Sequence, residues 1–205
     1  MKGLFIVVEG GEGCGKGTQI RRLKEYLESK GRDVIVVRDP GQTSAGEEIR
    51  NILLHSKSDL SSETQMLLYT AARNQMQEEI IKPALNGGKI ILCDRFDLST
   101  YVYQVMVQKA NPDMFESLKK HVLRPDLEIV LDVENVEEAL ERARKASGKY
   151  DRFESKNISF HYSIRDTYRQ TWARIIPAGT IEEVWERVKK EIDFFLEHEK
   201  DKFGL

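Results

Sequence analysis

Cysteine is scarce in this chain of 205 residues, which contains only Cys14 and Cys93. Two cysteines build neither a disulfide framework nor a thiolate metal cluster, and they fit a reducing compartment such as the cytoplasm. Long apolar runs are also missing, so no segment reaches the length of a membrane-spanning helix, and the N-terminus lacks the pattern of a signal peptide. We therefore expect a cytoplasmic protein with no membrane partner.

An excess of one charge is absent as well. The chain has 32 basic and 34 acidic residues and a formal net charge of −2. This balance argues against general nucleic-acid binding, which relies on a basic surface. Hydrophobic residues make up 40% of the chain, which suits one full-size core, and no linker or repeat divides it. The sequence thus predicts a single domain over residues 1–205.

Five short apolar runs have the character of buried strands, and segments with helical patterns separate them. They are Leu4–Val8, Asp33–Val37, Lys89–Cys93, Leu127–Leu131 and Arg174–Pro177. Strands that alternate with helices predict an α/β fold, a five-stranded parallel sheet with helices on both faces. Ligands bind beyond the carboxyl ends of such strands. The polar residues expected at that edge are Glu9, Arg38, Asp39, Asp94, Arg95 and Asp132.

A glycine-rich loop lies between the first predicted strand and a helical pattern over Thr18–Ser29, the context of a phosphate-binding P-loop. Its glycines let backbone N–H groups turn inward around an anion, and the helix N-terminus adds partial positive charge. Lys16 supplies a full charge to the outer phosphates. The residues expected to hold a nucleoside triphosphate are Gly10, Gly11, Glu12, Gly13, Cys14, Gly15, Lys16, Gly17 and Thr18.

The usual metal ligand of a P-loop is missing from this sequence. Gly17 occupies the position after the lysine, where a hydroxyl residue normally holds Mg²⁺, and the hydroxyl comes one place later at Thr18. Mg²⁺ would then be held through water or by a carboxylate such as Glu9 or Asp94.

Asp94 and Arg95 directly follow the predicted strand Lys89–Cys93. A carboxylate at this place can hold Mg²⁺ or its water ligands, and an arginine can bind a phosphate with two N–H groups. A surface ion pair at a strand end would give the same pattern. The P-loop one or two strands away favours a functional site.

Two further segments carry groups suited to reading a nucleotide base. Tyr69 and Arg73 lie four residues apart on one helix face, so they could stack on and reach a base, or simply pack on each other. The segment after Asp97 places hydroxyls and an amide on one helix face, although an N-cap followed by an ordinary helix explains that spacing as well. These residues are Ser99, Thr100, Tyr103 and Gln104.

In chain order, these segments resemble the thymidylate kinase family of the P-loop nucleoside monophosphate kinases. The matching segments are Val8–Gly10, Arg38–Gly41, Leu67–Arg73, Asp94–Gln104, Arg124–Leu127, Leu131–Val133 and Asp151–Glu154. The resemblance implies a P-loop NTPase fold and an ATP-dependent kinase that converts dTMP to dTDP in nucleotide biosynthesis. ATP and Mg²⁺ would be the cofactors, and the enzyme would form a homodimer.

The resemblance also implies roles for single residues. Arg95 would clamp the acceptor phosphate, with Glu9 close to the metal. Tyr69 would stack on thymine, Arg73 would reach its O4, and Gln104 with Thr100 would read the far edge. The adenine of ATP would lie near Ala178. The residues expected to bind the acceptor are Arg38, Pro40, Tyr69, Arg73, Arg95, Ser99, Thr100, Tyr103, Gln104 and Tyr168.

A basic segment, residues 142–153, is the expected lid over the phosphates. Family members without an arginine in the P-loop carry the catalytic arginine in the lid, and this P-loop has no arginine. The sequence leaves four candidates for the catalytic lid charge open, namely Arg144, Lys145, Lys149 and Arg152.

Two other functions stay open at this point. The Gly-Lys-Gly-Thr-Gln run at Gly17 resembles adenylate kinases, so the acceptor could be another dNMP or AMP. Gly17 and Ser147, which stands where related lids have an arginine, also allow a nucleotide-binding sensor with little turnover. Lys16, Asp94 and Arg95, with the basic lid, favour an active kinase over a sensor.

Overall fold

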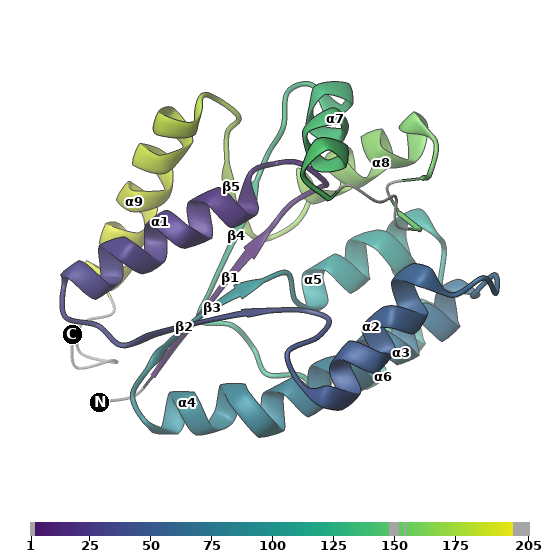
Figure 1. The fold of residues 1–205 in the computed structure, drawn as a ribbon, viewed down its shortest axis with the longest axis horizontal. Helices are drawn as coiled ribbons and strands as arrows, with labels where there is room; N and C mark the ends of the chain where they lie inside the picture. Colours follow the sequence, from purple (N-terminus) through teal and green to yellow (C-terminus); the bar gives the residue numbers. More distant parts are fainter. Residues whose placement is uncertain (1–2, 148–151, 154, 199–205) are drawn as a thin grey trace.

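The computed structural model describes residues 3–147, 152–153 and 155–198 (Figure 1). Within these residues, five parallel strands form one sheet in the order β2-β3-β1-β4-β5. The strands are β1 (Leu4–Glu9), β2 (Val34–Arg38), β3 (Ile90–Asp94), β4 (Leu127–Leu131) and β5 (Arg174–Ile176). The predicted five-stranded parallel sheet is confirmed, and each strand end lies within one residue of its prediction.

Helices cover both faces of the sheet, as predicted (Figure 1). They are α1 (Lys16–Ser29), α2 (Ser44–His55), α3 (Ser62–Met76), η1 (Gln77–Ile81), α4 (Lys82–Asn86), α5 (Asp97–Thr100), η2 (Tyr101–Val107), α6 (Pro112–Lys119), α7 (Val136–Ser147), α8 (Ile158–Tyr168) and α9 (Ile181–His198). The segments η1 and η2 are π-helical. None of the described helices combines the length and apolar character needed to cross a membrane.

Successive side chains of the central strand β1 point to opposite faces of the sheet. Helices cover both faces, so the side chains on both sides of β1 are buried. Leu4, Ile6 and Val8 pack into a core with apolar residues of α1 and α9. Phe5 and Val7 pack on the other face, in a core that includes residues of α3, η1 and α4. This burial on both sides explains why the residues from Leu4 to Val8 are all apolar.

The strand register brings polar residues together at the carboxyl edge of the sheet. Asp94 is paired with Val8 of β1, one residue before that strand ends, and with Arg38 at the end of β2. The P-loop continues from β1 at the centre of this edge and leads into α1. The fold therefore positions the P-loop beside the Asp94-Arg95 pair, one strand away.

The predicted lid is described only in part. Residues 142–147 form the end of α7, and Arg152 and Phe153 lie in a turn before α8. Residues 148–151, which include the candidate Lys149, lie outside the described part of the chain.

Candidate active site

The P-loop has the backbone geometry of an anion cradle. Gly10, Gly13 and Gly15 all have positive φ angles, of 140°, 65° and 92°, a region where L side chains are strained. Gly13 also lies against α7, where an added Cβ atom would come within 1.7 Å of the Ala139 carbonyl oxygen. The loop therefore requires glycine at this point both for its conformation and for the close approach of α7.

Lys16 is buried at the start of α1 and directs its ammonium group back into the loop. Its Nζ atom donates to the carbonyl oxygens of Gly10 and Gly11, at 3.1 and 3.0 Å. The Cys14 sulfur lies 3.6 Å from the same nitrogen. The positive charge is thus held at the mouth of the loop, where phosphate oxygens would bind.

A first pocket opens over the P-loop, and Asp94 of β3 forms part of its wall. The other lining residues include Gly13, Cys14, Gly15, Lys16, Gly17, Thr18, Arg142, Ala143, Gly179 and Thr180. Ala178, the residue expected near adenine, lines the adjoining surface hollow together with Asp132 and Asn135. The P-loop residues and Ala178 therefore border one continuous region of the surface.

The Asp94 carboxylate fits a magnesium site. Its Oδ1 atom is buried and has no hydrogen-bond partner among the described residues. Carboxylate oxygens and substrate phosphates are the ligands that Mg²⁺ prefers in nucleotide sites. Gly17 is exposed, and an added Cβ atom there would meet nothing within 4 Å, so sterics do not explain the glycine at this position.

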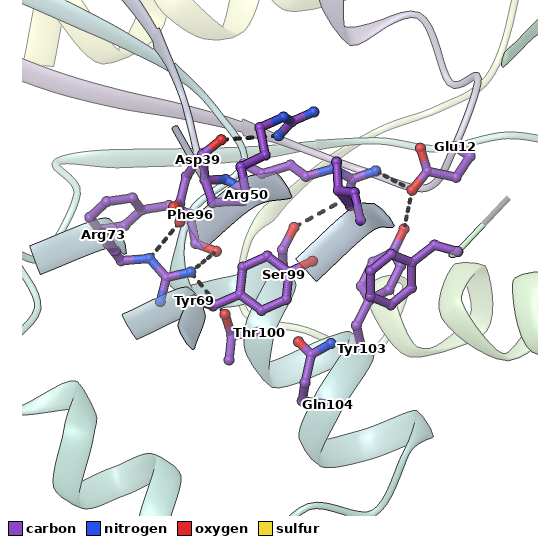
Figure 2. A pocket seen from close by; sticks show the side chains of 14 residues that line it. Glu12, Asp39, Arg50, Tyr69, Arg73, Phe96, Ser99, Thr100, Tyr103 and Gln104 are labelled. Atoms are coloured by element: carbon purple, nitrogen blue, oxygen red, sulfur yellow. Dashed lines mark hydrogen bonds and ion pairs between the residues drawn. The ribbon is translucent and has the colours of Figure 1, made fainter. Parts of the chain in front are cut away.

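A second pocket is lined by Arg95, the residue that follows Asp94, and Figure 2 shows it from close by. Its lining residues are Glu12, Asp39, Pro40, Arg50, Leu54, Tyr69, Arg73, Arg95, Phe96, Ser99, Thr100, Tyr103, Gln104 and Phe153. The structure thus brings together residues of the P-loop, the loop after β2, α2, α3 and α5–η2. The four polar residues predicted after Asp97 do lie on one face of that helical segment, and all four reach this pocket.

Arg73 is buried on one side of this pocket, 1% exposed, and three hydrogen bonds fix it. Its Nε donates to Asp39 at 2.6 Å, and its Nη2 donates to the Phe96 carbonyl and to the Thr100 hydroxyl. Among the described residues, its Nη1 group makes no hydrogen bond. A buried cationic donor held this firmly can bind a carbonyl oxygen of a ligand.

Arg95 lines the second pocket and has a backbone conformation that is uncommon for a residue other than glycine, with a φ of 67°. Its backbone N–H donates to the Val8 carbonyl, which fixes it to β1. Its guanidinium donates to Glu12 at 2.8 Å and to the Ser99 hydroxyl at 3.3 Å. The strained backbone directs this side chain toward the second pocket, beside the P-loop.

Glu12 of the P-loop carries a carboxylate next to these cations. Burial would raise the pKa of Glu12, but Arg95, Lys16 and a hydrogen bond from Tyr103 outweigh burial and hold it below its ordinary value. Glu12 is therefore ionised at neutral pH and neutralises Arg95.

Glu9 ends β1 beneath the site and is fully buried. One carboxyl oxygen accepts the backbone N–H groups of Phe96 and Ser99, and the other accepts the hydroxyls of Ser99 and Tyr168. Burial raises the pKa of Glu9 to about 7, although the bond from Ser99 and the charge of Arg95 oppose the shift. In this arrangement Glu9 anchors the loop that carries Arg95.

The shifted pKa makes a prediction about stability. Native Glu9 keeps its proton up to about pH 7, whereas an ordinary glutamate releases it near 4.5. The Glu9 contribution to the free energy of unfolding is thus fully present below 4.5 and is lost as the pH rises through 7, a change of about 3 kcal/mol. Urea unfolding measures the free energy of unfolding of wild type and of Glu9→Gln between about pH 4 and 8. The stability of wild type relative to the variant should fall as the pH rises. A difference in the free energy of unfolding that does not change with pH would contradict the raised pKa of Glu9.

Several predicted residues lie elsewhere. Arg38 is exposed and pairs with Glu47 at 3.0 Å, outside the lining of the second pocket. Tyr168 is buried beneath Arg95 and Ser99. Arg144 is exposed on α7. Arg152 donates to the carbonyl oxygens of Ser56 and Ser58, on the loop after α2.

The site predictions named neither Arg50 nor Leu54 of the second pocket, and they gave no individual role to Arg142 and Phe153 of the predicted lid. Arg50 of α2 donates to the Pro40 carbonyl at the pocket wall. Phe153 packs edge-on against Tyr103, with ring centroids 5.6 Å apart. Arg142 of α7 donates to the Gly13 carbonyl through two nitrogen atoms at 3.3 Å. Arg50 and Leu54 belong to no motif found in the sequence, and only the packing of α2 brings them to the site.

The chain is similar to thymidylate kinases both in sequence and in fold. A family model described as "Thymidylate kinase" matches residues 8–192. A thymidylate kinase from Caldicellulosiruptor saccharolyticus is 37% identical over 96% of this chain and 98% of its own length, and one from Pelobacter propionicus is 40% identical over 93% and 94%. The crystal structure of thymidylate kinase from Ehrlichia chaffeensis superposes with a TM-score of 0.74 at 29% identity and covers 94% of this chain and 99% of that one.

Proposed function

Because this chain belongs to the thymidylate kinase family, we propose that it transfers the γ-phosphoryl group of ATP to the phosphate of dTMP, which gives dTDP and ADP. The observation that carries the proposal is the placement of two consecutive residues. Asp94 lines the pocket over the P-loop, and Arg95 lines the pocket that contains Tyr69 and Arg73. A donor pocket and an acceptor pocket therefore meet at the end of β3.

On the donor side, the P-loop amides and Lys16 bind the phosphates of ATP. Phosphoryl transfer needs alignment and neutralisation of charge more than covalent chemistry. Mg²⁺, when bound, neutralises charge on the phosphate oxygens, and Asp94 would hold it directly or through water. The hydroxyl of Thr18 lines the same pocket and offers a further oxygen close to the phosphates.

On the acceptor side, Arg95 binds the phosphate of dTMP with the N–H groups that now face Glu12 and Ser99. Tyr69 lines the pocket, where its ring can stack on thymine, and Arg73, whose Nη1 makes no hydrogen bond among the described residues, would donate to the base O4. Thr100 and Gln104 line the same pocket and would read the far edge of the base. These contacts orient the acceptor so that its phosphate faces the P-loop.

The charge that meets the transferring phosphoryl group would come from the predicted lid. Arg142 already lies on the P-loop and lines the donor pocket, so it joins Arg144 as a candidate. Arg152 is bound to the loop after α2, which supports a positioning role for it instead. Family membership also leads us to propose that the enzyme works as a homodimer.

The proposal is tested by measuring ADP production from ATP and Mg²⁺ with dTMP, dUMP, dCMP, dGMP, dAMP and AMP offered separately. We expect dTMP to give the highest kcat/KM. Preference for another monophosphate would keep the kinase and reject the thymine pocket. Binding of ATP without turnover of any acceptor would instead identify a sensor.

A further inference from the structure

A cluster of three glutamines, two buried and one half-buried, lies behind the acceptor pocket. Gln65 belongs to α3 and is 3% exposed, and Gln104 belongs to η2 and is 1% exposed. The Nε2 atom of Gln104 donates to Oε1 of Gln65 at 3.3 Å, and Nε2 of Gln108 donates to the same oxygen at 3.3 Å. Of the three, only Gln104 lines the pocket, and Figure 2 shows its amide between Thr100 and Tyr103.

A backbone carbonyl sets the orientation of the whole cluster. The Nε2 atom of Gln65 donates to the carbonyl oxygen of Leu60 at 2.8 Å. A carbonyl oxygen can only accept, so the NH₂ group of Gln65 must face Leu60, and its Oε1 must face Gln104. The NH₂ group of Gln104 must then face Gln65.

The orientation of Gln104 decides which atom it can offer to a ligand. With its NH₂ group bound to Gln65, Gln104 has its Oε1 atom left for the pocket, and this atom only accepts hydrogen bonds. Thymine and uracil carry an N–H donor at N3, whereas the N3 atom of cytosine is an acceptor. A fixed Oε1 atom therefore accepts a hydrogen bond from N3–H of thymine or uracil. With cytosine, two acceptors, Oε1 and N3, would face each other.

We propose that Gln65 is a specificity-determining positioning residue, which holds the Gln104 amide so that the pocket accepts pyrimidines with an N3–H donor and rejects cytosine. The inference rests on the proposed function, since it assigns the acceptor base to this pocket. Gln65 acts through Gln104 and does not touch the substrate. Arg73 contributes a second, independent part of the selection, because its N–H groups suit O4 of thymine and not the amino group of cytosine.

The test replaces Gln65 with methionine, which has a similar length and no amide. In Gln65→Met the Gln104 amide is free to turn and can offer its NH₂ group to cytosine. We expect the ratio of kcat/KM for dTMP to that for dCMP to fall about tenfold, the size of one lost hydrogen-bond preference. The ratio for dTMP to dUMP should stay unchanged, since both bases carry N3–H. A simple loss of stability would lower all three activities together.

Gln108→Met is the matched control. Gln108 also bonds to Gln65 but lies outside the pocket lining, and its loss leaves the bond from Gln65 to Leu60 in place. We expect this variant to keep the wild-type ratio of dTMP to dCMP. If Gln65→Met does not fold, Gln65→Asn serves the same purpose, because its shorter side chain withdraws the amide oxygen from Gln104.

A double-mutant cycle shows whether Gln65 works through Gln104. In the Gln104→Met background, adding Gln65→Met should change the dTMP to dCMP ratio no further. An unchanged ratio in the folded Gln65 variant, or an equal fall in both backgrounds, would overturn the inference and leave the kinase assignment standing. A wild type that does not use dTMP would instead refute the proposed function, and the first assay shows this separately.

Discussion

Lys16→Ala is expected to lower kcat/KM for ATP by about 10³-fold, with the fold retained. Lys16 brings a full positive charge into the P-loop, where its Nζ atom lies on the Gly10 and Gly11 carbonyls. Negative charge on the outer phosphates grows as the phosphoryl group transfers, and the loss of one well-placed group that stabilises it typically costs 10²- to 10³-fold or more. Steady-state kinetics with saturating dTMP measures the effect.

Lys24→Ala is the matched control for this prediction. Lys24 belongs to the same helix, but it is half-buried and its ammonium group pairs with Glu28 at the surface, at 3.6 Å. An exposed pair of this kind contributes little, so activity and stability should stay close to wild type. Unfolding curves of Lys16→Ala check that the loop change does not unfold the domain. A folded Lys16→Ala enzyme with the wild-type rate would remove the P-loop from the mechanism.

Arg95→Ala is expected to raise KM for the acceptor by about 10- to 100-fold, while the Kd for ATP changes little. The guanidinium reaches into the acceptor pocket and carries the charge-assisted hydrogen bonds proposed for the acceptor phosphate, each with a net worth of about 1.5–3 kcal/mol. Calorimetric titration with ATP and kinetics over a range of dTMP concentrations separate the two sites.

Arg169→Ala provides the control for Arg95. Arg169 also lies at the carboxyl edge of the sheet, where it binds Asp132 at 2.7 Å, but it lines neither pocket. Its loss should leave the acceptor KM unchanged. If Arg95→Ala weakened ATP binding and left the KM for dTMP unchanged, the assignments of the donor pocket and the acceptor pocket would have to be exchanged.

The sequence predicted those parts of the fold that depend on local pattern. The run from Leu4 to Val8 is apolar at every position because both faces of β1 are buried, and this pattern alone indicates a central parallel strand. The P-loop was predictable because its glycines and Lys16 are consecutive in sequence. For the same reason Asp94 and Arg95 could be placed at the end of their strand.

The site was predictable where a single helix presents several groups on one side. Ser99, Thr100, Tyr103 and Gln104 reach the pocket together, as their spacing allowed. Spacing could not show what lies behind them. The hydrogen bond that Gln104 donates to Gln65 joins residues 39 positions apart, and it depends on how α3 packs against η2.

The contacts of Glu9 could also not be predicted from the sequence. A carboxylate after a strand beside a P-loop suggests a metal ligand, but both oxygens of Glu9 are bound to Phe96, Ser99 and Tyr168. Tyr168 is 159 residues away along the chain, and only the packing of α8 brings it there. The same contact explains why Tyr168 lies beneath the pocket and not in its wall.

The most direct test of the central claim follows the phosphoryl group itself. The enzyme is incubated with dTMP, Mg²⁺ and ATP that is labelled at the γ-phosphate, and the products are separated by chromatography. The account predicts that the label appears in dTDP, in amounts equal to the ADP formed. Label found only in inorganic phosphate, or in no product, would show that this chain hydrolyses or merely binds ATP, and it would contradict the account.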